Sequence, residues 1–116
     1  MKTYLAVYTG SPTASARWDS LSESERQQRQ VEGIVAWKAW ATGHASSIVQ
    51  MGGPLSRTKL VSPDGISDIR NNLAGFTIVQ APSHEAAASL FVNHPHFTIF
   101  PGAGVEVMEV LPVPAS

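Results

Sequence analysis

Residues 73–81 read Leu-Ala-Gly-Phe-Thr-Ile-Val-Gln-Ala, and they carry the clearest strand pattern in the chain. Its centre, residues 76–79, consists of aromatic and β-branched side chains, as is typical of strands. Side chains alternate between the two faces of a strand, so Phe76 and Ile78 lie on one side and Leu73 and Val79 on the other. The stretch therefore predicts a strand with two apolar faces, each of which needs cover.

Three further stretches have strand character: residues 3–8, 47–51 and 105–111. In the first of them Tyr4 and Tyr8 alternate with Leu5 and Val7, and the last stretch alternates in the same way. We expect the strand at 47–51 to end at the Gly-Gly-Pro that follows it. Residues 57–62 and 66–70 flank a Pro-Asp-Gly turn, which predicts a small separate hairpin.

A long helix is expected between these strands, from about Leu21 to Thr42. Ser20 and Ser22 are both candidate N-caps, because each precedes a glutamate by three residues in capping-box spacing. Gly43 is the expected residue just past the end of the helix. Residues 10–20 are expected to form a loop.

A second helix is expected after the strand at 73–81. Ser83 is its candidate N-cap, residues 86–92 supply helix formers and core side chains, and Pro95 is expected to end it. The element order is then β-α-β, a hairpin, and β-α-β again. This order predicts one α+β domain over residues 1–116, with a ferredoxin-like antiparallel sheet and two helices on one face.

Two helices can cover one face of such a sheet, but both faces are apolar. Burying a large apolar side chain contributes roughly 1.5 to 3 kcal/mol, and an exposed apolar sheet face marks an interaction surface. We therefore expect a homodimer with the two sheets face to face.

Composition narrows the classes of function. The 116 residues carry a net charge of −1 with no basic block, so we expect no nucleic-acid partner. There is no cysteine, which excludes disulfides and thiol catalysis. No run approaches the roughly 20 apolar residues of a membrane span, and the N-terminus lacks a signal-peptide pattern. By default, a cytoplasmic location is expected.

Several short motifs, in this order and spacing, give the chain a family resemblance. They are Gly52-Gly53-Pro54-Leu55, Leu73-Ala74-Gly75-Phe76, His94-Pro95-His96-Phe97 and Val105-Glu106-Val107, with Trp37-Lys38-Ala39-Trp40 and Phe100-Pro101-Gly102 typical of one branch. The chain resembles the YCII-related family along nearly its whole length. The resemblance implies a dimeric α+β barrel with a cleft between sheet and helices or at the dimer seam.

The same resemblance implies a direction for the chemistry. Most members have no assigned activity, and related barrels are associated with elimination or isomerisation of small organic acids, which makes a lyase or isomerase conceivable here. The family's suspected catalytic pair is a histidine in the long helix and an aspartate before a proline. In this chain Glu32 stands in the region of that histidine, and His94 precedes Pro95 in place of the aspartate.

The candidate proton carriers are His94 and His96, with Glu32 as a possible partner. Histidine titrates near neutral pH and can move protons, although a turn whose imidazoles bind backbone carbonyls would place the same residues. His-x-His also binds metals, but a third ligand is needed and nothing in the sequence brings one close. We expect no metal and no cofactor.

Four aromatic residues are the candidate walls of a substrate cleft: Tyr4, Tyr8, Trp37 and Phe76. The Trp37–Trp40 pair shares a helix face, which also suits a core or an interface. Arg57 and Arg70 bracket the hairpin and could hold a carboxylate or simply be solvated. The sequence thus predicts a protein that binds or transforms a small organic molecule by histidine acid–base chemistry. The alternative is a non-catalytic dimeric scaffold or accessory metabolite-binding module.

Overall fold

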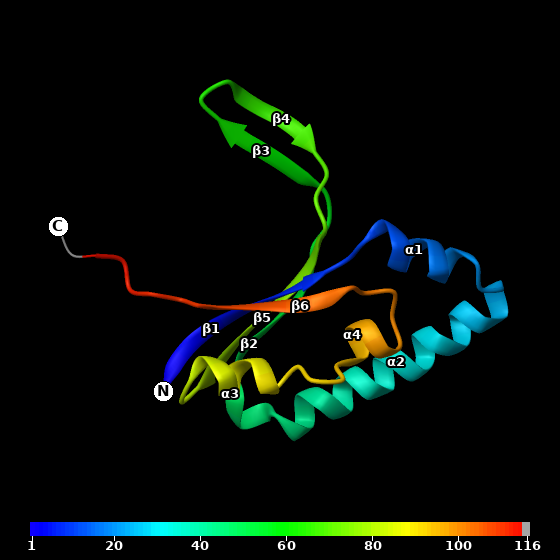
Figure 1. Ribbon diagram of the computed structural model, residues 1–116, viewed down its shortest axis with the longest axis horizontal. Helices are drawn as coiled ribbons and strands as arrows, with labels where there is room; N and C mark the ends of the chain where they lie inside the picture. Colours follow the sequence, from blue (N-terminus) through cyan, green and yellow to red (C-terminus); the bar gives the residue numbers. More distant parts are fainter. Residues whose placement is uncertain (115–116) are drawn as a thin grey trace.

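The computed structural model describes residues 1–114 and contains a four-stranded antiparallel sheet with helices on one side (Figure 1). The strand order is β2-β5-β1-β6, which is the ferredoxin-like order. The α+β ferredoxin-like prediction is confirmed. The sheet strands are β1 (Lys2–Thr9), β2 (Ile48–Pro54), β5 (Leu73–Ala81) and β6 (Gly104–Glu109).

Strand β1 lies in the interior of the sheet and is paired antiparallel on both sides. Leu5 faces Ile78 of β5 and Met108 of β6, and Tyr4 faces Val79. Because directly opposed residues share a face, the two faces are sorted as the alternation predicts. Tyr4, Tyr8 and Val79 face the helices and are buried.

Helix α2 (Glu23–Gly43) is the long helix, and its start is decided locally. The Ser22 side chain accepts from the Glu25 backbone N–H, and the Glu25 carboxylate accepts from the Ser22 backbone N–H. Ser22 is thus the N-cap, whereas Ser20 caps the end of the preceding helix. The predicted stop is wrong by one residue, because Gly43 is the last helical residue and His44 is the C-cap.

The expected loop over residues 10–20 is also wrong, since it contains helix α1 (Pro12–Asp19). Ser11 is the N-cap and accepts from the Ala14 backbone N–H at 3.1 Å. Pro12 occupies the first helical position, where its missing N–H costs nothing. The Ser-Pro pair was a start signal in a segment with a weak apolar pattern.

The second predicted helix is shorter than expected and is followed by another. Helix α3 (His84–Ser89) begins at the predicted cap Ser83. It ends before Val92, and the chain reverses through Asn93 in the left-handed region (φ 58°). Pro95 was expected to end a helix, but it begins α4 (Pro95–Thr98), as the first-turn preference of proline allows. A short 3-10 helix, η1 (Ala45–Ser47), precedes β2.

Strand β2 does not end at residue 51 but continues through Gly52-Gly53-Pro54 with register shifts. Gly52 has φ 67°, and a Cβ there would collide with the carbonyl oxygen of Phe76. Only glycine tolerates both conditions. The Gly-Gly pair thus bends the strand edge beside β5.

The buried core lies between the sheet and helices α2 and α3. Within residues 1–114, no helix covers the opposite face of the sheet (Figure 1). Its apolar side chains remain half-buried or exposed: Leu5, Val7, Phe76, Ile78 and Met108. The prediction of two apolar faces with helices for one of them is confirmed.

The predicted hairpin consists of β3 (Thr58–Ser62) and β4 (Gly65–Ile69), and it forms its own two-stranded sheet. In Figure 1 it projects from the sheet on the side opposite α2, α3 and α4. All residues of β4 are exposed. Isolated two-stranded hairpins have marginal stability in water. The contacts at the root of this hairpin therefore help to hold it in place.

Candidate active site

A cavity of about 490 Å³ opens between α2, the bent end of β2 and the segment after α4. Its walls are largely apolar, which is typical of small-molecule sites. The lining residues are Tyr8, Ile34, Trp37, Lys38, Met51, Gly52, Gly53, Pro54, Ala74, Gly75, Phe76, His96 and Phe100.

Tyr8 contributes the first polar group of this cavity. Its hydroxyl lies 2.7 Å from the Thr77 hydroxyl, which in turn donates to the Met51 carbonyl at 2.8 Å. Since the single Thr77 proton is used on Met51, Tyr8 is the donor to Thr77. Burial raises the pKa of Tyr8, and the hydrogen bond with Thr77 opposes this in part. Tyr8 is therefore a neutral phenol whose oxygen can still accept a hydrogen bond.

His96 contributes the second polar group. Its Nε2 lies 2.7 Å from the Thr9 carbonyl, so Nε2 carries the proton and donates. Burial lowers the pKa of His96, and the bond to Thr9 partly offsets this effect. The ring is thus neutral near pH 7 with Nδ1 as an acceptor, and within residues 1–114 Nδ1 receives no hydrogen bond. This is the arrangement of a general base.

His94 lies behind the cavity wall, and it is not among the lining residues. It is fully buried, and its Nδ1 accepts from the His96 backbone N–H at 3.0 Å. The rings of Tyr8, Trp37, Trp40 and Phe91 surround it at centroid distances of 4.5 to 5.8 Å. Its Nε2 has no hydrogen-bond partner among the described residues.

These surroundings decide the charge of His94. Burial, followed by the neighbouring His96 and His44, lowers the pKa of His94 to about 4. A buried imidazole among aromatic rings is costly to protonate. His94 is therefore neutral at physiological pH, and its clearest role is to cap α4 and hold the backbone of His96.

The structure brings together Tyr8, Trp37 and His96 from the residues predicted by sequence. Phe76 borders the cavity, although its pairing with Val7 directs its side chain to the helix-free face. Tyr4 and Glu32 lie outside the lining. Tyr4 is buried and stacks on His84 at 5.3 Å, and Glu32 is exposed on α2, where it accepts from Gln28.

Sequence reasoning missed Lys38 and Phe100. Lys38 follows Trp37 on α2 and is exposed at the cavity rim. Phe100 packs on Trp37 at 6.0 Å, and its ring fills the space where a Cβ of Gly33 would be. The signal for Phe100 was Gly33 itself, because a glycine inside a helix often marks a close approach.

Among residues 1–114, no three His, Cys, Asp or Glu side chains come close enough together to hold a metal ion. No helix there has the length and apolar character needed to span a bilayer.

Comparison with known proteins shows a likeness to a solved structure. No family model matches the chain, and a search of curated proteins finds no match. Among solved structures, the chain is similar to 5-chloro-2-hydroxyhydroquinone dehydrochlorinase (TftG) from Burkholderia phenoliruptrix AC1100, in complex with 2,5-dihydroxybenzoquinone. The TM-score is 0.52 and the identity 19%, over 91% of this chain and 90% of that one.

The chain therefore shares its overall α+β fold with that structure. At this identity the likeness concerns the fold alone.

Proposed function

We propose that this protein belongs to the YCII-related group and binds a small, flat organic molecule in the Tyr8–Trp37–His96 cavity. The observation that carries the proposal is the placement of His96. Its Nε2 is anchored on Thr9, its Nδ1 is free to accept, and its ring lines an apolar cavity with one phenol beside it. In a mostly apolar pocket, a small number of well-placed polar groups is enough to orient a ligand.

The proposed chemistry is proton transfer. His96 Nδ1 would take a proton from a C–H or O–H group of the ligand, and the resulting imidazolium would return it at another position or to a leaving group. Such steps are those of an isomerase or a lyase. The Tyr8 oxygen would accept a hydrogen bond from the ligand, and Lys38 at the rim would favour a ligand that carries negative charge.

In this proposal His94 and Glu32 do not carry the proton. His94 holds the His96 backbone, and its lowered pKa of about 4 makes it a poor base at neutral pH. Glu32 faces solvent outside the cavity. His96 is thus the proposed catalytic residue, His94 its positioning residue, and Tyr8 and Trp37 the proposed binding residues.

We further propose that the protein is a homodimer through the helix-free sheet face. Leu5, Val7, Phe76, Ile78 and Met108 form that face. An apolar surface of this kind is typical of an interface, and a face-to-face pair of identical sheets gives closed two-fold symmetry.

Titration with 2,5-dihydroxybenzoquinone, the ligand of the TftG structure, tests the proposed function. Binding should be saturable, should perturb the tryptophan fluorescence, and should weaken about tenfold or more in His96→Gln. His84→Gln is the matched control, since His84 is exposed and lies outside the cavity. Equal binding by His96→Gln and wild type would remove His96 from the site. Binding without any change in the ligand would support the non-catalytic alternative.

A further inference from the structure

A second cleft, of about 960 Å³, lies at the root of the β3–β4 hairpin, away from the cavity described above. Pro54 and Ala74 line the first cavity, whereas their neighbours Leu55 and Leu73 line this cleft. The two sites thus share no lining residue, although both reach the same strand ends.

The cleft has an excess of positive charge. Arg57, Lys59 and Arg70 line it with one carboxylate, Asp68. That carboxylate is already bound to Lys59 at 2.7 Å. Within the described chain neither arginine forms an ion pair, so two positive charges remain uncompensated in a chain whose net charge is −1.

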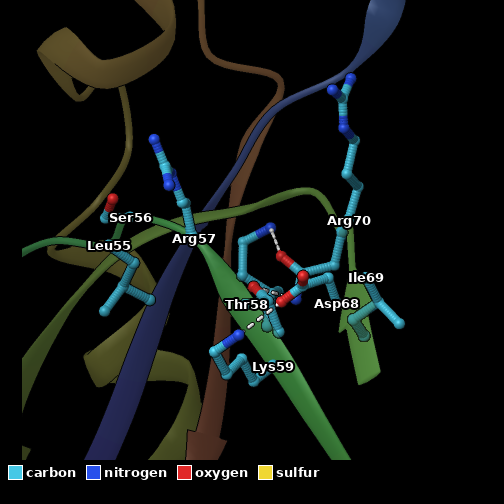
Figure 2. A pocket seen from close by; sticks show the side chains of 10 residues that line it. Leu55, Ser56, Arg57, Thr58, Lys59, Asp68, Ile69 and Arg70 are labelled. Atoms are coloured by element: carbon cyan, nitrogen blue, oxygen red, sulfur yellow. Dashed lines mark hydrogen bonds and ion pairs between the residues drawn. The ribbon is translucent and has the colours of Figure 1, made fainter. Parts of the chain in front are cut away.

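The two arginines immediately precede and follow the hairpin ladder. The ladder pairs Lys59 with Asp68 and Thr58 with Ile69, and Arg57 and Arg70 flank that last pair. Figure 2 shows both side chains extending the same way, away from the Lys59–Asp68 pair, with no dashed line to either guanidinium. An anion bound by both arginines would compensate their charges.

The root of the hairpin is held in place by local hydrogen bonds. The Asn71 side chain donates to Thr58 Oγ1 at 3.1 Å and accepts from the Leu73 backbone N–H at 3.0 Å. The Leu55 backbone N–H donates to the Ala74 carbonyl at 2.9 Å. These bonds span both chain segments that carry the arginines, so the cleft is preorganised.

The apolar residues of the cleft favour a ligand that has an apolar organic part. Leu55, Ile69 and Leu73 are 45%, 39% and 47% exposed where they line the cleft. A simple inorganic ion would leave them in water. A ligand with an apolar part would bury these side chains, and this burial of apolar surface would stabilise the complex.

We propose that this cleft binds a small organic dianion, a phosphate monoester or a dicarboxylate, between Arg57 and Arg70. Guanidinium groups present two parallel donors that match the oxygens of carboxylate and phosphate. Lys59 stays paired with Asp68 at the surface of the hairpin. The proposal does not depend on the function of the Tyr8–Trp37–His96 cavity.

The test uses the full-length ¹⁵N-labelled chain, titrated at constant ionic strength with phenyl phosphate, with glutarate and with uncharged benzyl alcohol. We expect saturable shifts of backbone amides in residues 55–59 and 68–73 with at least one of the two anions and none with benzyl alcohol. Saturation by phenyl phosphate identifies the phosphate source of the anion, and saturation by glutarate the carboxylate source.

Arg57→Gln and Arg70→Gln should each weaken this binding about tenfold. Both side chains are exposed, so a dispersed amide spectrum is expected for each variant. Arg29→Gln on α2 is the matched control and should bind as wild type does. Shifts that do not saturate with either anion would overturn the proposal. So would equal affinity in the Arg57 and Arg70 variants, or equal shifts with benzyl alcohol.

Discussion

The backbone N–H of His96 donates to the Nδ1 atom of His94 at 3.0 Å. This bond makes His94 the N-cap of α4 and fixes the peptide that carries the His96 ring into the cavity. His94 and His96 are separated only by Pro95, yet they have different surroundings and different roles. One is buried among aromatic rings and the other lines a cavity.

His94→Ala should destabilise the protein strongly, because it removes a fully buried ring and an N-cap together. We expect a loss of about 2 to 5 kcal/mol in the free energy of unfolding, in the range of large-to-small core substitutions. His94→Asn should recover about 1 kcal/mol, since its Oδ1 can accept from the His96 N–H. Urea denaturation measures both. Wild-type stability in His94→Ala would contradict the capping role.

Stability should fall as the pH is lowered from 6.5 towards 4. The pKa of His94 is about 4 when folded and ordinarily 6.5, so the unfolded chain binds more protons in this window. The slope should reach about 1.4 kcal/mol per pH unit for one proton, with His96 acting in the same direction. Urea midpoints between pH 4 and 8 provide the measurement. His94→Asn should flatten the curve and His84→Gln should not, and a curve that is flat for wild type would refute the neutral, buried state.

Gly102→Ala should disturb His96, although Gly102 itself does not line the cavity. A Cβ at Gly102 would collide with the His96 ring and with its backbone carbonyl oxygen. Overpacking of this kind costs about 1 to 3 kcal/mol, and it should also weaken binding of 2,5-dihydroxybenzoquinone. Gly10→Ala is the control, because nothing lies within 4 Å of its Cβ position. Equal effects of the two substitutions would argue against a ring held by Gly102.

Thr77→Val should break the relay from Tyr8 to Met51. Thr77 is fully buried, and its loss leaves the Tyr8 hydroxyl and the Met51 carbonyl without their partner. We expect destabilisation by about 1 to 3 kcal/mol. Tyr8→Phe combined with Thr77→Val should cost less than the sum of the two single changes. Strict additivity in this cycle would show that the two hydroxyls are not coupled, and the exposed Thr3→Val serves as the control.

Val7→Lys should convert the proposed dimer into a monomer. Val7 faces Phe76 on the helix-free side of the sheet, where a second copy would bury it. A lysine there would place an unpaired charge in the interface. Sedimentation should give twice the chain mass for wild type and for Val35→Lys, which alters an exposed residue of α2. A monomeric wild type would contradict the two-faced-sheet argument.

Much of the fold was predictable from local patterns. The alternation in β1 and β5, the Ser22–Glu25 capping box and the Asp-Gly turn each depend on neighbours in sequence, and each is confirmed. The errors arose where local signals were ambiguous. Pro95 can end one helix or begin the next, and the left-handed turn at Asn93 decides which.

The amino-acid sequence by itself determined the α+β order of elements and the presence of two apolar sheet faces, because alternation and capping act over a few residues. The tertiary structure alone decided which candidate residues share a site. His94, His96 and Glu32 can each transfer a proton in isolation. Packing put His94 into the core, left Glu32 in water and brought His96 beside Tyr8 and Trp37. Burial and proximity depend on contacts between segments far apart in the chain, which no local pattern encodes.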